Sequence, residues 1–246
     1  MRYAAKFLRF AVNFYRYIVV SRLAARKLSR LAHSCQNNVE CIVKLAFEFN
    51  YKFPPLPSIT IKPAQIYEEI VKLAKIFAKL RPRYVMEIGT ANGGTLFLWC
   101  MLASDDATII SVDLPGGNFG GGYPRWRIPL YKSFRKVSQK LYLIRADSHD
   151  IRTLEIVKNV LRGNKLDFLF IDGDHTYEGV KKDFNMYVPL VRDNGIIALH
   201  DIVPGPPENV GGVPRFWREI KKRYRYIEIV KDWRQGGYGI GLIYKE

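Results

Sequence analysis

Residues 84–94 read Tyr-Val-Met-Glu-Ile-Gly-Thr-Ala-Asn-Gly-Gly, and this stretch decides the fold. The apolar run 84–88 has the length of a buried strand. The glycines that follow stand where a strand must bend sharply into a helix and let a ligand approach the backbone. Four further aliphatic or β-branched runs alternate with helical stretches and end in polar or glycine clusters, at 108–112, 141–144, 168–171 and 196–199. This alternation is typical of a doubly wound parallel sheet.

The last part of the chain departs from this alternation. Residues 226–230 and 239–244 also predict strands, but the gap between them holds a Gly236-Gly237 turn and is too short for a crossover helix. We therefore expect an α/β, Rossmann-like fold with a mostly parallel seven-stranded sheet and a C-terminal antiparallel strand.

The N-terminal segment is helical in pattern and strongly basic. The chain has 39 Lys and Arg against 23 acids, a net charge of +16, and no acid precedes Glu40. A polar stripe at helical spacing separates apolar faces over residues 1–30. The prolines in residues 53–57 cannot continue a helix, so we expect a linker there. The predicted division is a basic helical extension over 1–58 and an α/β domain over 59–246.

Composition excludes several protein classes. The 246 residues are 48% apolar and 25% charged, which is an ordinary globular balance. We expect no membrane-spanning helix, because no apolar run approaches about 18 residues. Cys35, Cys41 and Cys100 have the spacing of neither a disulfide framework nor a metal knuckle, which favours a reducing, cytoplasmic location.

Polar side chains gather where the predicted strands end. In open α/β sheets, ligands bind beyond the carboxyl ends of the strands. Three of the four histidines of the chain fall there together with six acids and three other residues: Glu87, Gly89, Thr90, Asp113, Asp147, Ser148, His149, Asp172, Asp174, His175, His200 and Asp201. The first turn lacks the glycine of a dinucleotide fingerprint at Ala91, which argues against NAD and FAD. Asp113, at the end of the next strand, is placed to accept hydrogen bonds from ribose hydroxyls.

These residues also carry a family resemblance. Glu87-Ile-Gly-x-x-x-Gly93-Gly94, Asp113, Asp147 and Phe170-Ile-Asp-Gly-Asp-His175 resemble the motifs of class I S-adenosylmethionine-dependent methyltransferases. The residues Ile61-Lys-Pro-Ala-Gln65, 113–122 and 172–179 resemble the branch of cephalosporin-hydroxylase-like and macrolide-sugar O-methyltransferase-like proteins. The resemblance runs from about residue 60 to the C-terminus.

The resemblance implies S-adenosylmethionine as cofactor and assigns residues to it. The methionine end would lie over Gly89, Thr90 and Gly93, with Glu87 near its ammonium. Asp113 would hold the ribose, Asp147 and Ser148 would flank the adenine, and Asp172 would complete the set. The implied reaction is in-line methylation of a hydroxyl on a small molecule or glycan.

Proton removal from the acceptor has two candidate routes. Metal-dependent relatives imply a divalent site at Asp172, His200 and Asp201, for Mg²⁺ or another ion, although His200 departs from their all-oxygen pattern. Alternatively His175 or His200 is the general base beside Asp172, because imidazole titrates near neutral pH. The glycine-rich loop 115–124 and the loop 204–214 are expected to form a lid and an opposite wall, with Tyr123, Arg125, Trp126 and Arg127 touching substrate.

Three matters stay open at this level. An RNA methyltransferase is the alternative function, because residues 215–225 are rich in Lys and Arg, but the Asp/Asn-Pro-Pro-aromatic signature is missing after the fourth strand. Residues 1–30 serve either oligomerisation and packing or contact with a membrane periphery. We expect a homo-oligomer and do not favour a nucleic-acid partner.

Overall fold

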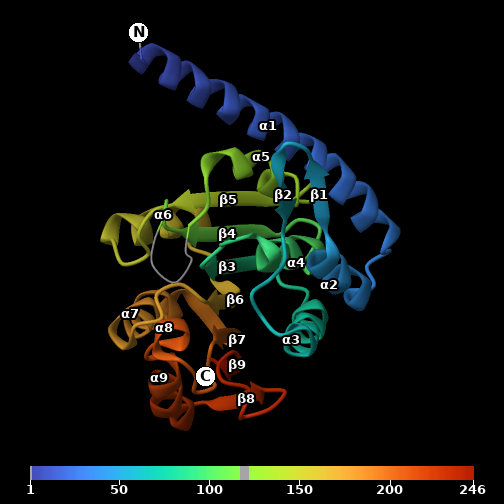
Figure 1. Cartoon of the computed structure of the whole chain (residues 1–246). Helices are drawn as coiled ribbons and strands as arrows, with labels where there is room; N and C mark the ends of the chain where they lie inside the picture. The colour runs from blue at the N-terminus through green and yellow to red at the C-terminus, as the bar shows by residue number, and fades with distance from the viewer. Residues whose placement is uncertain (1, 117–121) are drawn as a thin grey trace.

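The structure, a computed structural model that describes residues 2–116 and 122–246, is built on a seven-stranded sheet (Figure 1). The strand order is β5-β4-β3-β6-β7-β9-β8, and β9 runs antiparallel to both of its neighbours. This confirms the predicted fold class. The strands are β3 (Tyr84–Ile88), β4 (Thr108–Asp113), β5 (Lys140–Arg145), β6 (Leu166–Ile171), β7 (Val191–His200), β8 (Arg225–Ile229) and β9 (Ile240–Tyr244).

Helices cover both faces of the sheet, and strand alternation decides which core each side chain joins. In β3, Val85 packs into the core formed with α2, α3 and α4, whereas Met86 and Ile88 pack into the core formed with α6, α7 and α9. The helices of the chain are α1 (Arg2–Ser34), α2 (Val39–Glu48), α3 (Tyr67–Leu80), α4 (Gly94–Leu102), α5 (Ile128–Lys132), α6 (Ile151–Leu161), α7 (Tyr177–Tyr187), α8 (Pro207–Val210) and α9 (Val213–Ile220).

The expected proline-rich linker is a hairpin instead. β1 (Asn50–Phe53) and β2 (Leu56–Thr60) pair antiparallel, so the prolines occupy the turn and the edge of a small sheet rather than an open connection. The predicted boundary between residues 58 and 59 falls inside β2. Residues on both sides of it, including Val43 and Phe97, share one core.

Helix α1 packs on the domain through its second half. Val20, Ala24 and Leu28 are buried, and the Tyr17 ring stacks on Trp126 with 5.0 Å between centroids. The N-terminal turns of the helix extend past the body of the domain (Figure 1). The helical pattern expected of the N-terminal segment is confirmed over α1 and α2.

Two cysteines differ from the expectation of free thiols. Cys35 and Cys41 form a disulfide across the turn between α1 and α2, while Cys100 is buried and free. Sequence reasoning missed the bridge because Cys35 lies in the turn after α1 and Cys41 lies on α2, so only the shape of the turn brings them together. Among the described residues, no helix is both long and apolar enough to cross a bilayer.

Candidate active site

One cleft of about 990 Å³ lies at the carboxyl ends of the parallel strands. Its walls include eight of the predicted site residues: Gly89, Asp113, Asp147, Ser148, Asp172, His175, His200 and Asp201. The sheet therefore brings the ends of five strands to one place, as the switch-point rule requires. Glu87, Thr90 and Gly93 lie behind this lining. The individual roles of all these residues remain predictions.

The glycine turn is held closely against its surroundings. Gly89 has a φ of +95°, and a Cβ there would collide with the backbone carbonyl of Asp172. Gly93 has a φ of +82°, and a Cβ there would come within 2.6 Å of the Tyr131 ring. Only glycine combines this backbone conformation with such close approach at both positions.

Asp113 organises the same turn. Its Oδ2 accepts hydrogen bonds from the amides of Thr90 at 3.0 Å and Ala91 at 2.9 Å. Its Oδ1 accepts one from the amide of Gly122 at 3.0 Å. Burial raises the pKa of Asp113, and this effect is larger than the lowering of the pKa by the three hydrogen bonds. Asp113 therefore both lines the cleft and holds the glycine turn in place. This position is compatible with the predicted contact between Asp113 and a ribose.

Glu87 lies away from the position the resemblance implied for it. Strand alternation puts it on the α4 face with Val85, where it is fully buried. Its Oε2 accepts hydrogen bonds from Thr95 at 2.9 Å and from Trp99 at 3.0 Å. Its Oε1 accepts one from Ser111 at 2.9 Å. Burial raises the pKa of Glu87 to about 8, so the acid is mostly neutral at pH 7 and both oxygens already have partners.

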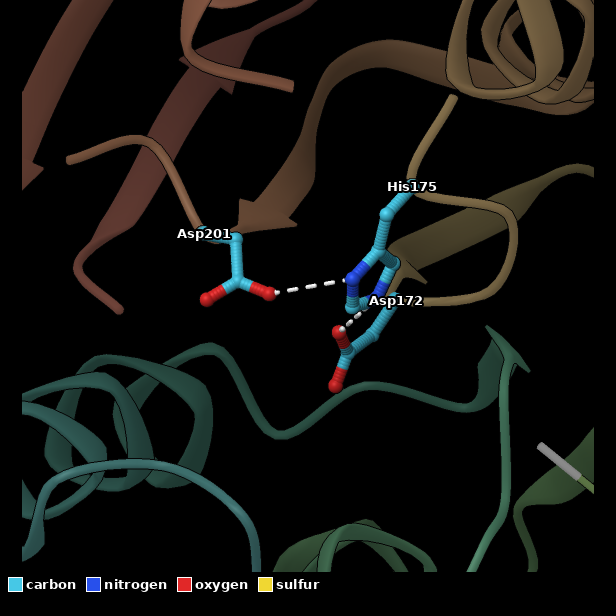
Figure 2. A group of neighbouring side chains, drawn as sticks. All are labelled: Asp172, His175 and Asp201. Carbon is cyan, nitrogen blue, oxygen red and sulfur yellow. Dashed lines mark ion pairs between the residues drawn. The ribbon is translucent and has the colours of Figure 1, made fainter. Parts of the chain in front are cut away.

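A cluster of two histidines and two aspartates occupies the centre of the cleft. Nδ1 of His200 lies 3.0 Å from Oδ1 of Asp172 and 3.5 Å from Oδ2 of Asp201. His200 is 4% exposed, and its Nε2 has no hydrogen-bond partner among the described residues. His175 lies between the two carboxylates, 3.5 Å from Asp172 and 3.4 Å from Asp201 (Figure 2).

The loop after β6 positions His175. Thr176 caps α7 by accepting a hydrogen bond from the amide of Gly179 at 3.0 Å. The carbonyl of His175 accepts one from the amide of Gly212 at 2.7 Å, and its Nδ1 lies 2.5 Å from the carbonyl of Asn209. The loop between β7 and α9 thus fixes both the backbone and the ring of His175.

The charges in the cluster stabilise one another. Burial alone would raise the pKa of Asp172, but the charge of His200 and hydrogen bonds from both histidines outweigh it and hold that pKa well below its usual range. Burial alone would lower the histidine pKa values, but the carboxylates raise those of His175 and His200 to about 9. Burial raises the pKa of Asp201. The resting cluster is a set of ion pairs rather than free bases.

The cluster also offers a set of metal ligands, in a grouping that differs by one residue from the predicted one. Ligand atoms of Asp172, His175 and Asp201 all lie within 4.8 Å of one another. The expectation named His200 in place of His175. Two carboxylates and one imidazole suit a transition metal better than Mg²⁺.

The segments expected to form a lid are largely packed inward. Residues 117–121 of the glycine-rich loop lie outside the described residues. Tyr123 is 2% exposed and packs against Tyr131, so its ring is buried rather than exposed to a substrate, whereas Trp126 is half-buried and stacks on Tyr17 of α1. Arg127 donates hydrogen bonds to the carbonyls of Thr60 and Asn92. In the second loop, Glu208, Asn209 and Val210 line the cleft, as expected of an opposite wall.

Sequence reasoning assigned no role to two residues that line the cleft. Nε2 of Gln65 donates a 2.8 Å hydrogen bond to Oδ2 of Asp172. Nε2 of His149 lies 3.2 Å from Oδ1 of Asp183, which is fully buried. The Gln65 contact spans distant parts of the chain, and the only sequence signal for it is its place in the 61–65 motif.

Comparisons with known proteins agree with this geometry. Residues 86–202 match a family model described as a methyltransferase domain. The chain is 28% identical over 144 residues to an uncharacterized protein of Sinorhizobium fredii, covering 57% of this chain and 15% of that protein. It is 32% identical over 136 residues to an uncharacterized protein of Acanthamoeba polyphaga mimivirus, covering 52% of this chain and 55% of that protein. The chain thus spans little more than half of the length of one relative and a small part of the other.

Solved structures share the fold at low sequence identity. An O-methyltransferase from Bacillus cereus, in complex with S-adenosylhomocysteine (SAH), matches with a TM-score of 0.53 and 15% identity over 90% of both chains. An O-methyltransferase from Streptomyces achromogenes involved in tomaymycin synthesis, in complex with S-adenosylmethionine, matches with a TM-score of 0.55 and 16% identity over 83% of this chain and 90% of that one. The fold is therefore that of the class I methyltransferases. The methyltransferase-domain match over residues 86–202 and the shared fold both agree with the resemblance seen in the motifs.

Proposed function

We propose that this methyltransferase methylates a hydroxyl group of a small molecule or glycan, with His200 as the base that accepts the hydroxyl proton. The bound cofactor supplies an electrophilic methyl group on a positively charged sulfur. The cleft suits such a cofactor in size and in charge, because acids line it from the glycine turn to β7.

The single observation that carries the proposal is the arrangement of His200. Its Nδ1 is directed at Asp172 at 3.0 Å, and its buried Nε2 has no partner in the described part of the chain. Asp172 thereby fixes the ring and the tautomer, which leaves Nε2 to take a proton from an acceptor hydroxyl. A cationic ligand nearby disfavours imidazolium, so cofactor binding should lower the pKa of His200 from about 9 toward neutrality.

His175 has a different part in the proposal. It contacts both carboxylates and the carbonyl of Asn209, so its ring is held on several sides. As an imidazolium it neutralises Asp172 and Asp201, which keeps Asp172 from binding a proton and lets it orient His200. His175 therefore positions the acids rather than reacting itself.

A divalent metal is a second element of the proposal. Asp172, Asp201 and one of the histidines would hold it, and a bound metal would polarise the acceptor hydroxyl. Metal and proton compete for the same imidazole, so metal binding should release protons.

The experiment that tests the function has two stages. Calorimetry with SAH first measures cofactor-site occupancy in the full chain. Release of SAH from S-adenosylmethionine is then measured against a panel of phenols, sugars and glycosides, with His200→Gln as the inactive comparison. Absence of SAH binding, or turnover that is the same in His200→Gln, contradicts the proposal.

RNA is not favoured as the acceptor, because several basic residues of α9 and the turn after it have partners within the fold. Lys221 pairs with Glu228 at 2.7 Å, and Arg223 lies 3.9 Å from Glu219. Arg215 stacks over the ring of Tyr177, 4.4 Å from its centroid. Salt-dependent affinity for RNA would revive this alternative.

We further propose that the basic N-terminal turns of α1 contact an anionic membrane surface and that the protein forms a homo-oligomer. The first proposal is supported by the extension of those turns past the domain (Figure 1). The second is supported by exposed apolar side chains on α6, Ile151 at 62% and Ile156 at 46%. Light scattering after gel filtration tests the oligomer.

A cytoplasmic location remains a proposal, and the Cys35–Cys41 bridge bears on it. Strongly reducing compartments keep thiols free. Thiol titration of denatured protein prepared without reductant shows whether Cys35 and Cys41 are bridged. One free thiol per chain means that the bridge forms, and three mean that it does not.

A further inference from the structure

The segment 61–66, which connects β2 to α3 and is called the strap below, lies across the glycine turn. A Cβ on Gly94 would come within 2.5 Å of the Ile61 carbonyl and 2.6 Å of the Pro63 nitrogen, so the strap touches the first residue of α4. Nη1 of Arg127 donates hydrogen bonds to the carbonyls of Thr60 at 3.0 Å and Asn92 at 3.3 Å, which ties the strap to the turn. Pro63 belongs to this strap, and α3 begins four residues later, at Tyr67.

Gln65 is the polar side chain of the strap that reaches the centre of the cleft. It is 4% exposed, and its Nε2 donates a 2.8 Å hydrogen bond to Oδ2 of Asp172. Because a carboxylate only accepts hydrogen bonds, the amide must present its NH₂ group to Asp172. The amide oxygen of Gln65 is then directed elsewhere, and this buried Oε1 has no partner among the described residues.

A buried acceptor without a donor destabilises the fold, so we expect its partner to be a group that arrives with a ligand or with water. The methionine end of the cofactor is expected over the turn that the strap covers. The acid of that turn, Glu87, is not available to an ammonium group, because Thr95, Trp99 and Ser111 occupy its oxygens. In the described part of the chain, Gln65 and Asp172 are two side-chain acceptors that lie beside the turn and line the cleft.

We propose that Oε1 of Gln65 accepts a hydrogen bond from the primary ammonium group of the methyl donor, in the place that sequence resemblance gives to Glu87. This assignment rests on the proposed use of the cleft by S-adenosylmethionine. Asp172, bound to the same amide, supplies negative charge beside that ammonium while its other oxygen holds His200. In this assignment, the strap binds the amino-acid end of the methyl donor and does not contact its nucleoside end.

Calorimetry on the full chain tests the assignment with Gln65→Met, which keeps the length of the side chain and removes its polar atoms. Three ligands are compared: SAH, the analogue of SAH in which hydrogen replaces the α-amino group, and 5′-methylthioadenosine. We expect Gln65→Met to weaken SAH by about 10- to 100-fold, the range for a hydrogen bond to a charged group. The other two ligands should bind the wild type and the variant within about twofold of each other, because neither carries the ammonium.

Equal weakening of all three ligands, or an unchanged affinity for SAH, overturns the role of Gln65. Unchanged SAH affinity with a raised KM for the acceptor also overturns it, because the amide would then contact the acceptor. If Gln65→Met melts at a lower temperature than the wild type, Gln65→Asn, which retracts the amide by one methylene, gives the same test. Failure of the wild-type chain to bind SAH would instead contradict the proposed function itself.

Discussion

Nδ1 of His200, the last residue of β7, lies 3.0 Å from Oδ1 of Asp172, the residue that follows β6. The parallel pairing of these strands places Ile171 beside Leu199, one residue before each member of the pair. The sheet register therefore sets the contact on which the proposed proton transfer depends.

His200→Gln should lower kcat by about 10²- to 10⁴-fold, the usual contribution of a general base. Its affinity for SAH should stay within about threefold of wild type, because the ring does not hold the cofactor in this proposal. His33→Gln, at an exposed position on α1, is the matched control and should keep full activity. A larger loss of kcat in His175→Gln than in His200→Gln would move the base to His175.

Asp113→Asn should weaken SAH by about 10- to 100-fold and lower the free energy of unfolding by about 1–3 kcal/mol. The second effect follows from the amides of Thr90, Ala91 and Gly122, which all donate to this carboxylate. An asparagine has a single oxygen for them and presents an NH₂ group in place of the other. Urea unfolding with and without SAH separates the two effects, and weakened binding with unchanged stability would contradict a structural role.

Glu87→Gln tests whether Glu87 is a buried, mostly neutral acid. With a folded-state pKa of about 8, the folded chain keeps a proton that the unfolded chain loses above the ordinary pKa of 4.5. Stability of the wild type should therefore fall as pH rises from about 4.5 to 8, by up to about 1.4 kcal/mol per pH unit from this group. The variant lacks this pH dependence. In urea unfolding at pH 5, 6.5 and 8.5, the free energy of unfolding of the variant should therefore rise relative to that of the wild type as the pH increases.

The same variant should bind SAH within about threefold of the wild type. The histidines of the cluster titrate in both proteins, so their contributions cancel in the comparison. A strong loss of SAH affinity would instead place Glu87 against the ammonium, as the motif resemblance implied.

Mn²⁺ should bind the full chain and release protons, detected as a heat of binding that depends on the ionisation enthalpy of the buffer. Asp201→Asn should weaken Mn²⁺ by at least about 10-fold, because it removes one of two carboxylate ligands. Asp147→Asn, a more exposed acid of the same cleft, is the control. Activity that is indifferent to EDTA, together with no Mn²⁺ binding, would remove the metal from the proposal.

Flotation with phosphatidylserine vesicles should recover the full chain, and vesicles of phosphatidylcholine alone should not. Replacing Arg2, Lys6 and Arg9 by Gln should reduce recovery at low salt, because each basic residue near an anionic surface contributes about 1 kcal/mol. The same number of Gln substitutions at Lys72, Lys75 and Lys79 of α3 is the control. Equal recovery of both variants would exclude an anchor in the first turns of α1.

The parallel sheet was predictable because each strand is a short apolar run closed by polar residues, and the end of each run therefore fixed the edge of the cleft. Glu87 shows where this reasoning ends. Its position near the end of β3 predicted that its side chain would lie in the cleft. Because side chains alternate along a strand, the side chain is instead buried on the face of the sheet that α4 covers. A strand-end position indicates proximity to a ligand, not the direction of the side chain.

The contacts that sequence reasoning did not find depend on how the chain turns, whether over 107 positions or over six. Gln65 reaches Asp172, and Cys35 meets Cys41 across a helix turn in which Gln36 and Asn37 adopt positive φ values. Local periodicity carries no information about such meetings. Replacement of the predicted linker by the β1–β2 hairpin has the same origin, because prolines at a turn and at an open connection look alike in sequence.

The stacking of Tyr17 on Trp126 limits how the first helix can be studied. Deleting residues 1–58 would remove any lipid-binding charges. It would also remove Tyr17 and so expose Trp126, which lies in the segment after the glycine-rich loop. A shortened enzyme that lost activity would then report a damaged catalytic domain, whatever the helix does at a bilayer. Point substitutions before Tyr17 are the only route that keeps these two outcomes apart.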